Sequence, residues 1–281
     1  MNINQIINKV TDLPSLPEAV IQLNDLLKDS STNLDIVTGI IEKDAGLSAK
    51  VLRLANSSYY GMSSQVDSVS RAIIVLGFNT ICNVVMSVGV SSLFKRQGKS
   101  ADIDMTGLWV HTLGCAVAAK VIMQKKNSME SEKAFVCGIL HDIGKVIIAH
   151  AAPDEQRKIF LLLTNPAITL IQAENEIIGA NHAEIGYAVA KKWRFPDYIL
   201  EVIRHHHLPS AAVTVPDIVS AVHLGNTISK ALSFGRSTEN RVTFVDSFAW
   251  KQLGIKETDI PLLLTDVQNE FDLAMEFWMM D

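Results

Sequence analysis

Residues 138–150 read GILHDIGKVIIAH. Within this apolar stretch, His141 and Asp142 directly follow two large aliphatic residues, and Lys145 comes one turn later. An imidazole, a carboxylate and an ammonium group among core-forming residues cost about 1–3 kcal/mol each if they are buried without partners. We therefore expect the rest of the chain to supply polar partners for them.

The composition limits the class of protein. The 281 residues are 48% hydrophobic with a net charge of −5, which allows a substantial core but gives no general attraction to nucleic-acid phosphates. No apolar run approaches the roughly 18–20 residues that cross a bilayer, and the N-terminus lacks a secretory signal. We expect a cytoplasmic protein that binds neither membrane nor nucleic acid. Cys82, Cys115 and Cys137 are widely spaced and are predicted to be reduced core residues.

The apolar residues recur at helical spacing, which predicts an all-α fold. Ala72, Ile73 and Leu76 share a face that ends at Gly77, and residues 81–94 are long enough, without turn signals, to favour a buried helix despite their β-branched content. No segment alternates convincingly as a strand. The polar segment KRQGKSADIDMTG at 95–107 separates two parts of the chain.

These features predict three regions along the chain. We expect an N-terminal helical subdomain at 1–98, a second helical subdomain at 108–232, and a C-terminal helical extension at 233–281.

Helical periodicity directs several polar side chains inward. Ile199, Val202, Ile203 and His206 fall at i, i+3, i+4 and i+7, so His206 is expected on a buried stripe. The complete inward-facing set is His111, His141, Asp142, His182 and His206, with Asn226 as a polar companion. Bringing these groups together removes the cost of burying each one alone.

This set has the chemistry of a metal site. Imidazole and carboxylate ligands suit Zn, Fe, Mn or Ni, and a carboxylate beside a histidine can bridge two ions. A bound divalent metal lowers the pKa of its water to roughly 7, which provides a nucleophile for phosphorus. Asp142 and Lys145 are the candidate catalytic residues: Lys145 would hold a phosphoryl oxygen, and Gly144 would let the backbone bend before it.

Several separated motifs resemble known families. The sequences LWVHT (108–112), HDIGK (141–145), NHAEIG (181–186) and IRHHHLP (203–209) resemble the HD superfamily of metal-dependent phosphohydrolases. LPSLPEAV (13–20), IIEKDAGLSAKVLRLANSSYYG (40–61) and SRAIIVLGFNTI (70–81) resemble the N-terminal half of the HDOD family. The likeness covers about residues 12–232, with the motifs in the family's order.

The resemblance implies a fold and a role. It implies an N-terminal helical bundle packed on an HD-like bundle, in a bacterial signalling protein whose relatives often serve as regulatory or output domains and have often lost metal ligands. It also implies a set of metal ligands, which are His111, His141, Asp142, His182 and His206.

Two departures from the HD pattern bear on activity. Asn226 stands where the pattern usually has a closing aspartate, and a neutral amide is a weaker ligand, which puts one of the metal ions in doubt. LPSAAVTVP follows the histidine run where the related HD-GYP enzymes have their GYP motif, which disfavours cleavage of cyclic di-GMP.

A purely structural role remains an alternative for some of these residues. His141 and Asp142 could be a hydrogen-bonded pair at a helix end, and Lys145 a surface cation. His223 could support the site or be a plain helix residue.

Further residues are expected outside the site. His150 is predicted at a helix end, His205 and His207 in solvent, and Glu174 and Glu176 on a solvent face. The aromatic and Met residues of 275–280 are expected to pack on the body of the protein rather than to form a partner surface.

Two main functions follow from the sequence, and a third possibility is a purely structural adaptor with an empty site. The first is a regulatory protein with one or two divalent transition metal ions, weak or absent hydrolase activity and a signalling protein as partner. The alternative is an active metal-dependent phosphohydrolase or phosphodiesterase that acts on a nucleotide or another phosphoester.

Overall fold

The computed structural model describes residues 5–6, 18–26, 34–57, 60, 65–95, 103–239 and 241–278. Within these ranges the protein is helical and has no strand, which confirms the all-α prediction. The helices are α2 (Glu18–Leu26), α3 (Leu34–Glu42), α4 (Ala45–Ala55), α5 (Val69–Leu76), α6 (Phe78–Lys95), α7 (Met105–Lys125), α8 (Ser131–Leu140), α9 (Ile143–Ala151), α10 (Pro153–Leu163), α11 (Leu170–Ile178), α12 (His182–Lys192), α13 (Asp197–His205), α14 (Pro216–Ala231), α15 (Ser247–Leu253) and α16 (Ile260–Trp278).

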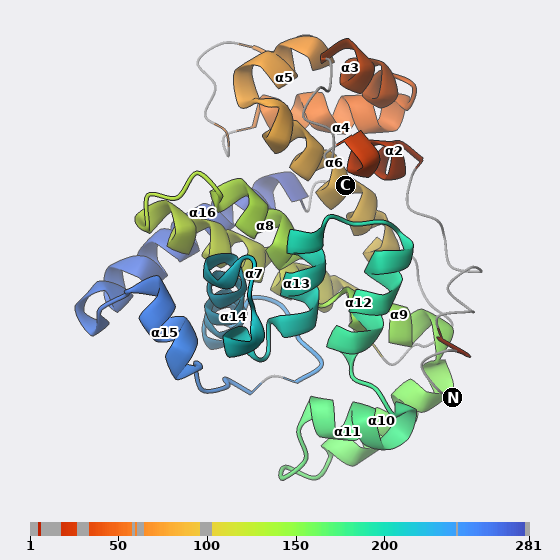
Figure 1. The fold of residues 1–281 in the computed structure, drawn as a ribbon, viewed down its shortest axis with the longest axis vertical. Coiled ribbons are helices and arrows are strands. Elements are labelled where there is room, and N and C mark those ends of the chain that lie inside the picture. Colours follow the sequence, from red (N-terminus) through yellow and green to blue (C-terminus); the bar gives the residue numbers. More distant parts are fainter. Residues whose placement is uncertain are drawn as a thin grey trace.

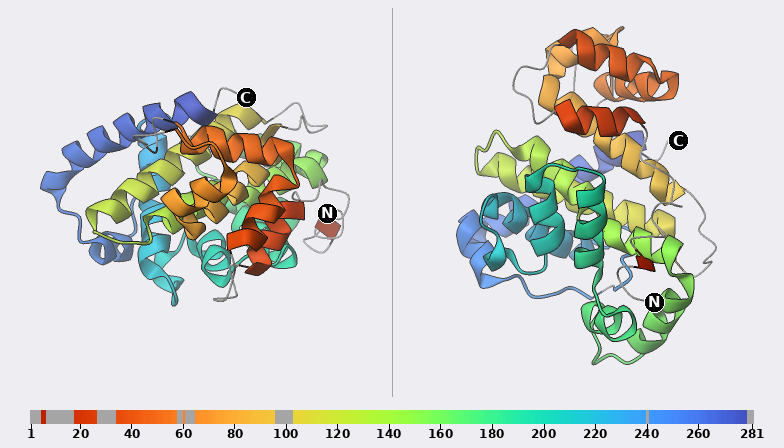
Figure 2. Two further views of the ribbon diagram at one scale, coloured as in Figure 1. Left: turned by 90° about the horizontal axis from the view of Figure 1, so that it is seen from above. Right: turned by 45° about the vertical axis from the view of Figure 1, so that its right-hand side comes forward.

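The N-terminal helices form a group of their own at one end of the molecule. Helices α2 to α5 gather there, and α6 runs from this group into the main body, where it packs on α7 and α8 (Figure 1). A second view shows the same separation (Figure 2). Residues 96–102, between α6 and α7, lie outside the described residues, so the predicted boundaries at 98 and 108 stay a prediction.

Local sequence signals explain several helix ends. Asp44 caps α4 by accepting a hydrogen bond from the Leu47 amide, and Ser68 caps α5, which ends at Gly77 as predicted. The buried helix expected at 81–94 is α6, which already begins at Phe78, so Asn79 and Thr80, whose side chains could cap a helix that begins at 81, lie within its first turn. Ser15, which forms a capping-box pattern with Glu18 in the sequence, lies outside the described residues.

Three helices, α7, α8 and α14, pack closely at the centre of the main body. The helices can approach this closely because glycines lie at the contacts. A Cβ on Gly138 of α8 would lie 2.4 Å from Ala116 Cα, and a Cβ on Gly225 of α14 would lie 2.7 Å from the Cys115 carbonyl oxygen. Both contacts are with α7. This packing holds the α7 and α8 segments that carry His111 and His141 side by side. The three cysteines are buried and form no disulfide, as predicted.

The chain turns at His141 and Asp142. His141 ends α8 and Asp142 precedes α9, so both side chains project from one corner. Helix α9 then packs on α12, where a Cβ on Gly144 would lie 1.8 Å from the His182 carbonyl oxygen. Gly144 is therefore needed for the contact between the two helices, and the predicted role in bending the backbone was wrong.

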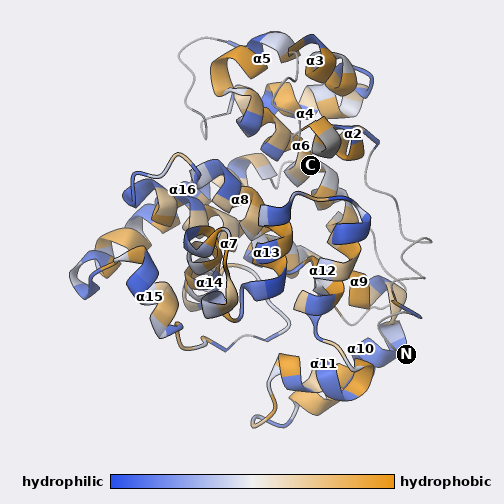
Figure 3. Cartoon of the chain, viewed as in Figure 1, coloured by the Kyte–Doolittle hydropathy of each residue, from blue (hydrophilic) through white to orange (hydrophobic). Residues whose placement is uncertain are grey.

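Most apolar side chains of the described helices face the interior. Outer helices such as α10, α11 and α15 carry both hydrophobic and hydrophilic residues (Figure 3). The C-terminal helix α16 packs on α7, with Phe271, Phe277 and Trp278 buried, so the described part of 275–280 packs on the body as expected.

Two helical stretches, Met105–Lys125 and Ser131–Ala151, are long and apolar enough to cross a bilayer by length and composition. The bent pair Val69–Leu76 and Phe78–Phe94 also passes this test. In these two stretches, 83% and 94% of the most apolar 18-residue segment is buried inside the protein. Packing in the core therefore accounts for the apolar composition of both helices.

Candidate metal centre

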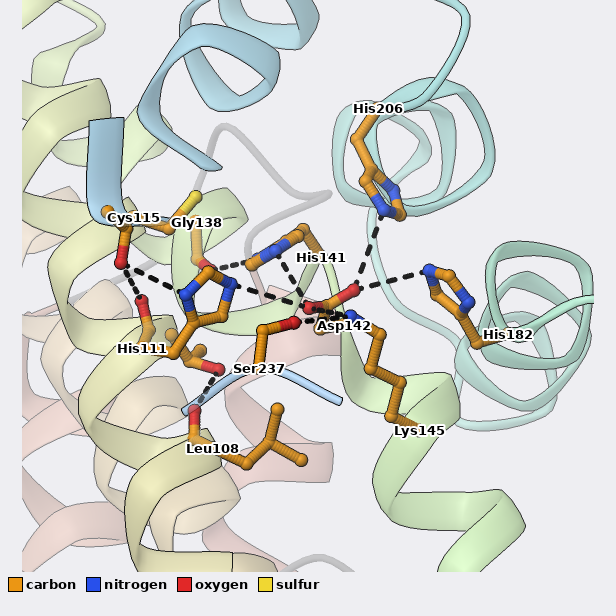
Figure 4. Close-up of polar contacts among 12 residues, drawn as sticks. Leu108, His111, Cys115, Gly138, His141, Asp142, Lys145, His182, His206 and Ser237 are labelled. Carbon is orange, nitrogen blue, oxygen red and sulfur yellow. Dashed lines mark hydrogen bonds and ion pairs between the residues drawn. The ribbon is translucent and has the colours of Figure 1, made fainter. Parts of the chain in front are cut away.

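Four histidines surround the carboxylate of Asp142. Their Nε2 atoms lie 3.2 Å (His141) and 3.8 Å (His111) from Asp142 Oδ2, and 3.3 Å (His182) and 3.6 Å (His206) from Asp142 Oδ1. The residues come from α7, the α8–α9 corner, α12 and the end of α13, and their side chains point toward one another (Figure 4). All five are at most 1% exposed. The structure thus brings together five of the six sequence-predicted ligands.

The outer nitrogen of each ring has a fixed partner. His141 Nδ1 donates to the Gly138 carbonyl at 2.7 Å, and His206 Nδ1 donates to the Ile203 carbonyl at 2.9 Å. The Ser229 hydroxyl donates to the His111 carbonyl at 2.9 Å. Ser229 Oγ can therefore accept a hydrogen bond from His111 Nδ1 at 3.1 Å. These contacts keep a proton on each Nδ1, so Nε2, which faces Asp142, is the nitrogen that can offer a lone pair to a metal ion.

The inner atoms lack hydrogen bonds. The Nε2 atoms of His111, His141 and His206 and Asp142 Oδ1 are buried with no hydrogen-bond partner among the described residues. Such orphaned atoms are costly unless a ligand satisfies them. Metal–ligand bonds of about 2.0–2.2 Å place neighbouring ligand atoms about 3.0–3.4 Å apart. The spacing around Asp142 is close to this, so the residues present fit a divalent transition metal.

The ligands fall into two sets that share Asp142. One consists of His111, His141 and Asp142, and the other adds His182, His206 and His207 to the same carboxylate. Within each set the candidate ligand atoms all lie within 4.8 Å of one another. A carboxylate with one oxygen toward each set can bridge two ions.

The electrostatics of the cluster couple its charges. Burial opposes ionisation of Asp142, but His141 and Lys145 outweigh it and hold the pKa of this carboxyl well below its usual range. Burial also disfavours the charged form of His141, but the Asp142 carboxylate raises the pKa of His141 to about 10. Burial lowers the pKa of His206 to about 3. Without metal at neutral pH, His141 is therefore positively charged, with a proton on each ring nitrogen, and His206 is neutral.

Lys145 is buried rather than exposed on the surface. Its Nζ lies 2.6 Å from Asp142 Oδ2 and 3.3 Å from Ser237 Oγ. A lysine three residues after Asp142 faces it across one helical turn. The interpretation as a surface cation was wrong, and a phosphate contact by Lys145 stays a prediction.

His207 belongs to the cluster, although the sequence placed it in solvent. Its Nε2 lies 2.8 Å from His182 Nε2, so the interpretation as a solvated residue was wrong. Two lone pairs this close repel unless a proton or a cation lies between them. The histidine at 205 is half-buried and is not in either ligand set.

Glu174 is also part of the site, and its prediction as a solvent-facing residue was wrong. It is 2% exposed, and its Oε2 accepts from His182 Nδ1 at 2.7 Å and from the His182 amide at 2.9 Å. Burial lowers the pKa of His182, but the Glu174 carboxylate outweighs this effect and raises it. The 170, 174, 178 spacing, with Leu170 and Ile178 both buried, was the signal that could have identified it.

The position of His182 follows from a capping box. Asn181 Oδ1 accepts from the Glu184 amide at 3.1 Å, and Glu184 Oε2 accepts from the Asn181 amide at 3.0 Å, so the two residues form the capping box that their spacing in the sequence allows. Gly179 ends the preceding helix with φ +81°. The short turn between them delivers His182 to the first turn of α12, facing Asp142.

Helix α14 carries two residues for which the sequence suggested a role in the site. His223 supports the site: its Nδ1 donates to the His206 carbonyl at 2.8 Å, and its Nε2 accepts from the Asp246 amide at 3.0 Å. Asn226 is buried, and its Oδ1 has no hydrogen-bond partner in the described part of the chain; its role as a ligand stays a prediction. His150 lies in the last turn of α9 as expected, with Nδ1 donating to the Val146 carbonyl.

Comparison with solved structures finds the same architecture. An HDOD domain protein of unknown function from Geobacter sulfurreducens superposes with a TM-score of 0.80 at 26% identity, over 98% of each chain. A candidate phosphohydrolase from Shewanella amazonensis SB2B superposes with a TM-score of 0.75 at 25% identity, over 98% of this chain and 97% of the other.

Sequence comparison supports this relationship. An uncharacterized protein of Treponema pallidum (strain Nichols) is 27% identical over 232 residues, which is 79% of this chain and 43% of that protein. The chain spans less than half the length of the curated relatives it matches. The family model of the HDOD domain matches residues 13–209. The chain therefore belongs to the HDOD domain family.

Proposed function

We propose that this protein is a bacterial signalling or regulatory protein whose His–Asp cluster binds one or two divalent transition metal ions and has weak or absent hydrolase activity. The observation that carries the proposal is the convergence of four Nε2 atoms on Asp142, with their Nδ1 atoms held by fixed partners. His111, His141, Asp142, His182 and His206 would hold the metal, with His207 as a further ligand and Asn226 as a weak one. Fe, Mn, Zn and Ni all suit this donor set.

Two features support weak catalysis. The cluster is enclosed, because His141, Asp142 and His206 are 0% exposed. Lys145, which would hold a phosphoryl group, is already paired with Asp142 at 2.6 Å. A substrate would have to break this ion pair before it could use the ammonium group, at a cost that a buried pair makes large.

The alternative function is a working phosphohydrolase or phosphodiesterase acting on a nucleotide or another phosphoester. The convergence of four histidines on Asp142 favours it, since a purely structural adaptor has no need to gather these side chains. A bound divalent ion would supply Lewis acidity toward phosphoryl oxygens and acidify water. In that function Asp142 would hold the metal, and Lys145 would leave Asp142 and contact the substrate phosphate.

A signalling protein is the proposed partner, and a cytoplasmic location is the proposed setting. The separate group α2 to α5 offers a surface away from the metal cluster. No contact with membrane or nucleic acid is part of the proposal, because the net charge of −5 and the buried apolar helices favour neither.

The test is a turnover screen of metal-loaded protein on phosphomonoesters, nucleotides and cyclic dinucleotides. The proposal expects bound metal with kcat well below the roughly 1–1000 s⁻¹ of ordinary enzymes. Turnover in that range, lost in Asp142→Asn, would establish the alternative.

A second variant tests the interpretation of residue 226. Asn226→Asp restores a carboxylate, and we expect it to increase metal loading. Unchanged loading would contradict the role of Asn226 as the weak ligand.

A further inference from the structure

A cavity of about 350 Å³ lies beside the metal cluster and is lined by cations. His111, Lys230, Phe234, Gly235, Arg236 and Ser237 form its walls. His111 is the one member of the ligand sets in this lining, so the cavity meets the cluster at that edge. A volume of this size is at the lower end of small-molecule sites and suits a compact ligand.

The cations of this cavity have no direct counter-ion. Within the described ranges, the side chains of Lys230 and Arg236 have neither an ion-pair nor a hydrogen-bond partner. Asp142 and Glu239 act on Lys230 at longer range, but Lys145 already pairs with Asp142 at 2.6 Å. The cavity therefore has surplus positive charge, with Lys230 half-buried and Arg236 exposed, and an anion there would be attracted.

Ser237 lines the cavity and also contacts Lys145 of the cluster. It is 6% exposed, and its Oγ accepts from Lys145 Nζ at 3.3 Å. The hydroxyl hydrogen of Ser237 is then free to donate to a ligand oxygen. An oxygen-rich anion in the cavity would meet Arg236, Lys230 and this hydroxyl together.

The loop that carries these groups is fixed in place. Gly235 has φ +63°, and a Cβ there would lie 2.2 Å from the Gly107 carbonyl and 2.6 Å from the His111 amide. The Arg236 amide donates to the same Gly107 carbonyl at 2.9 Å. Phe234 stacks on Phe271 of α16 with ring centroids 3.7 Å apart. A loop backbone that is already held in place loses little entropy when a ligand binds to it.

We infer that the cavity between α7 and the 233–237 loop binds a phosphate group, either as inorganic phosphate or as the terminal phosphate of a small phosphomonoester. Arginine and lysine with a hydroxyl donor match the several acceptor oxygens of phosphate. The loop lies beyond residue 209, outside the part of the chain that the family model matches. This inference deepens the proposed function by naming a ligand class, but phosphate binding to Lys230 and Arg236 does not require that the metal be bound.

The test is calorimetric titration of the full chain with inorganic phosphate, with adenosine monophosphate and with adenosine. Arg236→Gln and Lys230→Gln remove one lining cation each. Arg241→Gln is the matched control, because Arg241 is exposed like Arg236 but lies outside the cavity lining. We expect saturable binding of phosphate or of the monophosphate, weakened about tenfold or more by either lining substitution and unchanged in the control. Adenosine should not bind.

The two titrants separate the two sources of phosphate. Binding of inorganic phosphate alone identifies the free ion, whereas tighter binding of the monophosphate identifies a phosphomonoester. Absence of binding by both at millimolar concentration overturns the inference. Equal binding by wild type, Arg236→Gln and Lys230→Gln also overturns it.

Metal content measured on the same samples separates this inference from the proposed function. If the protein holds no metal but phosphate binding depends on Arg236 and Lys230, the proposed function fails and the phosphate site stands. If metal is bound and phosphate is not, the phosphate site fails alone.

Discussion

Replacing Gly144 by alanine should damage both stability and the metal cluster. A Cβ at this position would lie 1.8 Å from the His182 carbonyl oxygen, 2.7 Å from its carbon and 3.0 Å from the Gly186 amide nitrogen. Ordinary carbon–oxygen contacts are about 3.3 Å or longer, so α9 and α12 would have to separate by about 1.5 Å. The obstacle is backbone rather than a flexible side chain, which puts the expected loss of unfolding free energy at the upper end of about 1–3 kcal/mol.

The same displacement reaches the metal ligands, because His182 Nε2 lies 3.3 Å from Asp142 Oδ1 across this helix contact. Binding sites tolerate roughly 0.5 Å of misplacement, so we expect Gly144→Ala to weaken metal binding at least tenfold.

Gly39→Ala is the matched control. Gly39 lies in α3, and nothing lies within 4 Å of a Cβ placed there. The same chemical change should stabilise the protein by about 0.5–1 kcal/mol through helix propensity.

Thermal unfolding of chelated protein, combined with metal titration, measures both effects. With about 2–4 °C of Tm per kcal/mol for chains of this size, Gly144→Ala should lower Tm by about 4–12 °C. A Gly144→Ala protein with wild-type Tm and wild-type metal affinity would refute the packing argument.

Three further outcomes are expected. Glu174→Gln removes the carboxylate that accepts from His182 and should weaken metal binding about 10–100-fold in a competition titration, whereas the exposed Glu176→Gln on the same helix should not; equal affinities would contradict the role of Glu174. Since the pKa of His141 is raised to about 10 without metal, metal must displace its proton at neutral pH, so affinity should rise about tenfold per pH unit between pH 6.5 and 8.5; a flat profile would show that no proton is displaced. Removing metal with a chelator should lower Tm, by the equivalent of about 2.7 kcal/mol if the ion had been present at 100 times its Kd, and an unchanged Tm would mean that no folded-state site was emptied.

The helices and most of the residues of the His–Asp cluster could be predicted because their signals are local. The Asn181–Glu184 capping box sets the start of α12 and therefore the direction of His182. The stripe of Ile199, Val202 and Ile203 sets the buried face on which His206 follows.

The misplaced residues depend on where helices end and what packs on them. The stripe argument directed His207 to solvent because it extended a regular helix, but α13 ends at His205 and the chain then turns His207 back toward His182. For Gly144, the reason for glycine lies in the backbone of α12, 38 residues away in sequence at His182, and no local pattern reveals such a contact. The partner of Glu174 was likewise on a separate helix, α12.

Elemental analysis of the full chain, purified without chelator, tests the metal site most directly. We predict at least one transition metal ion per wild-type chain, the same amount in His205→Gln, whose side chain is outside both ligand sets, and a large loss in Asp142→Asn, whose carboxylate both sets share. Wild-type protein that holds no metal after incubation with Fe, Mn, Zn or Ni, or Asp142→Asn protein that retains the wild-type amount, would contradict the account.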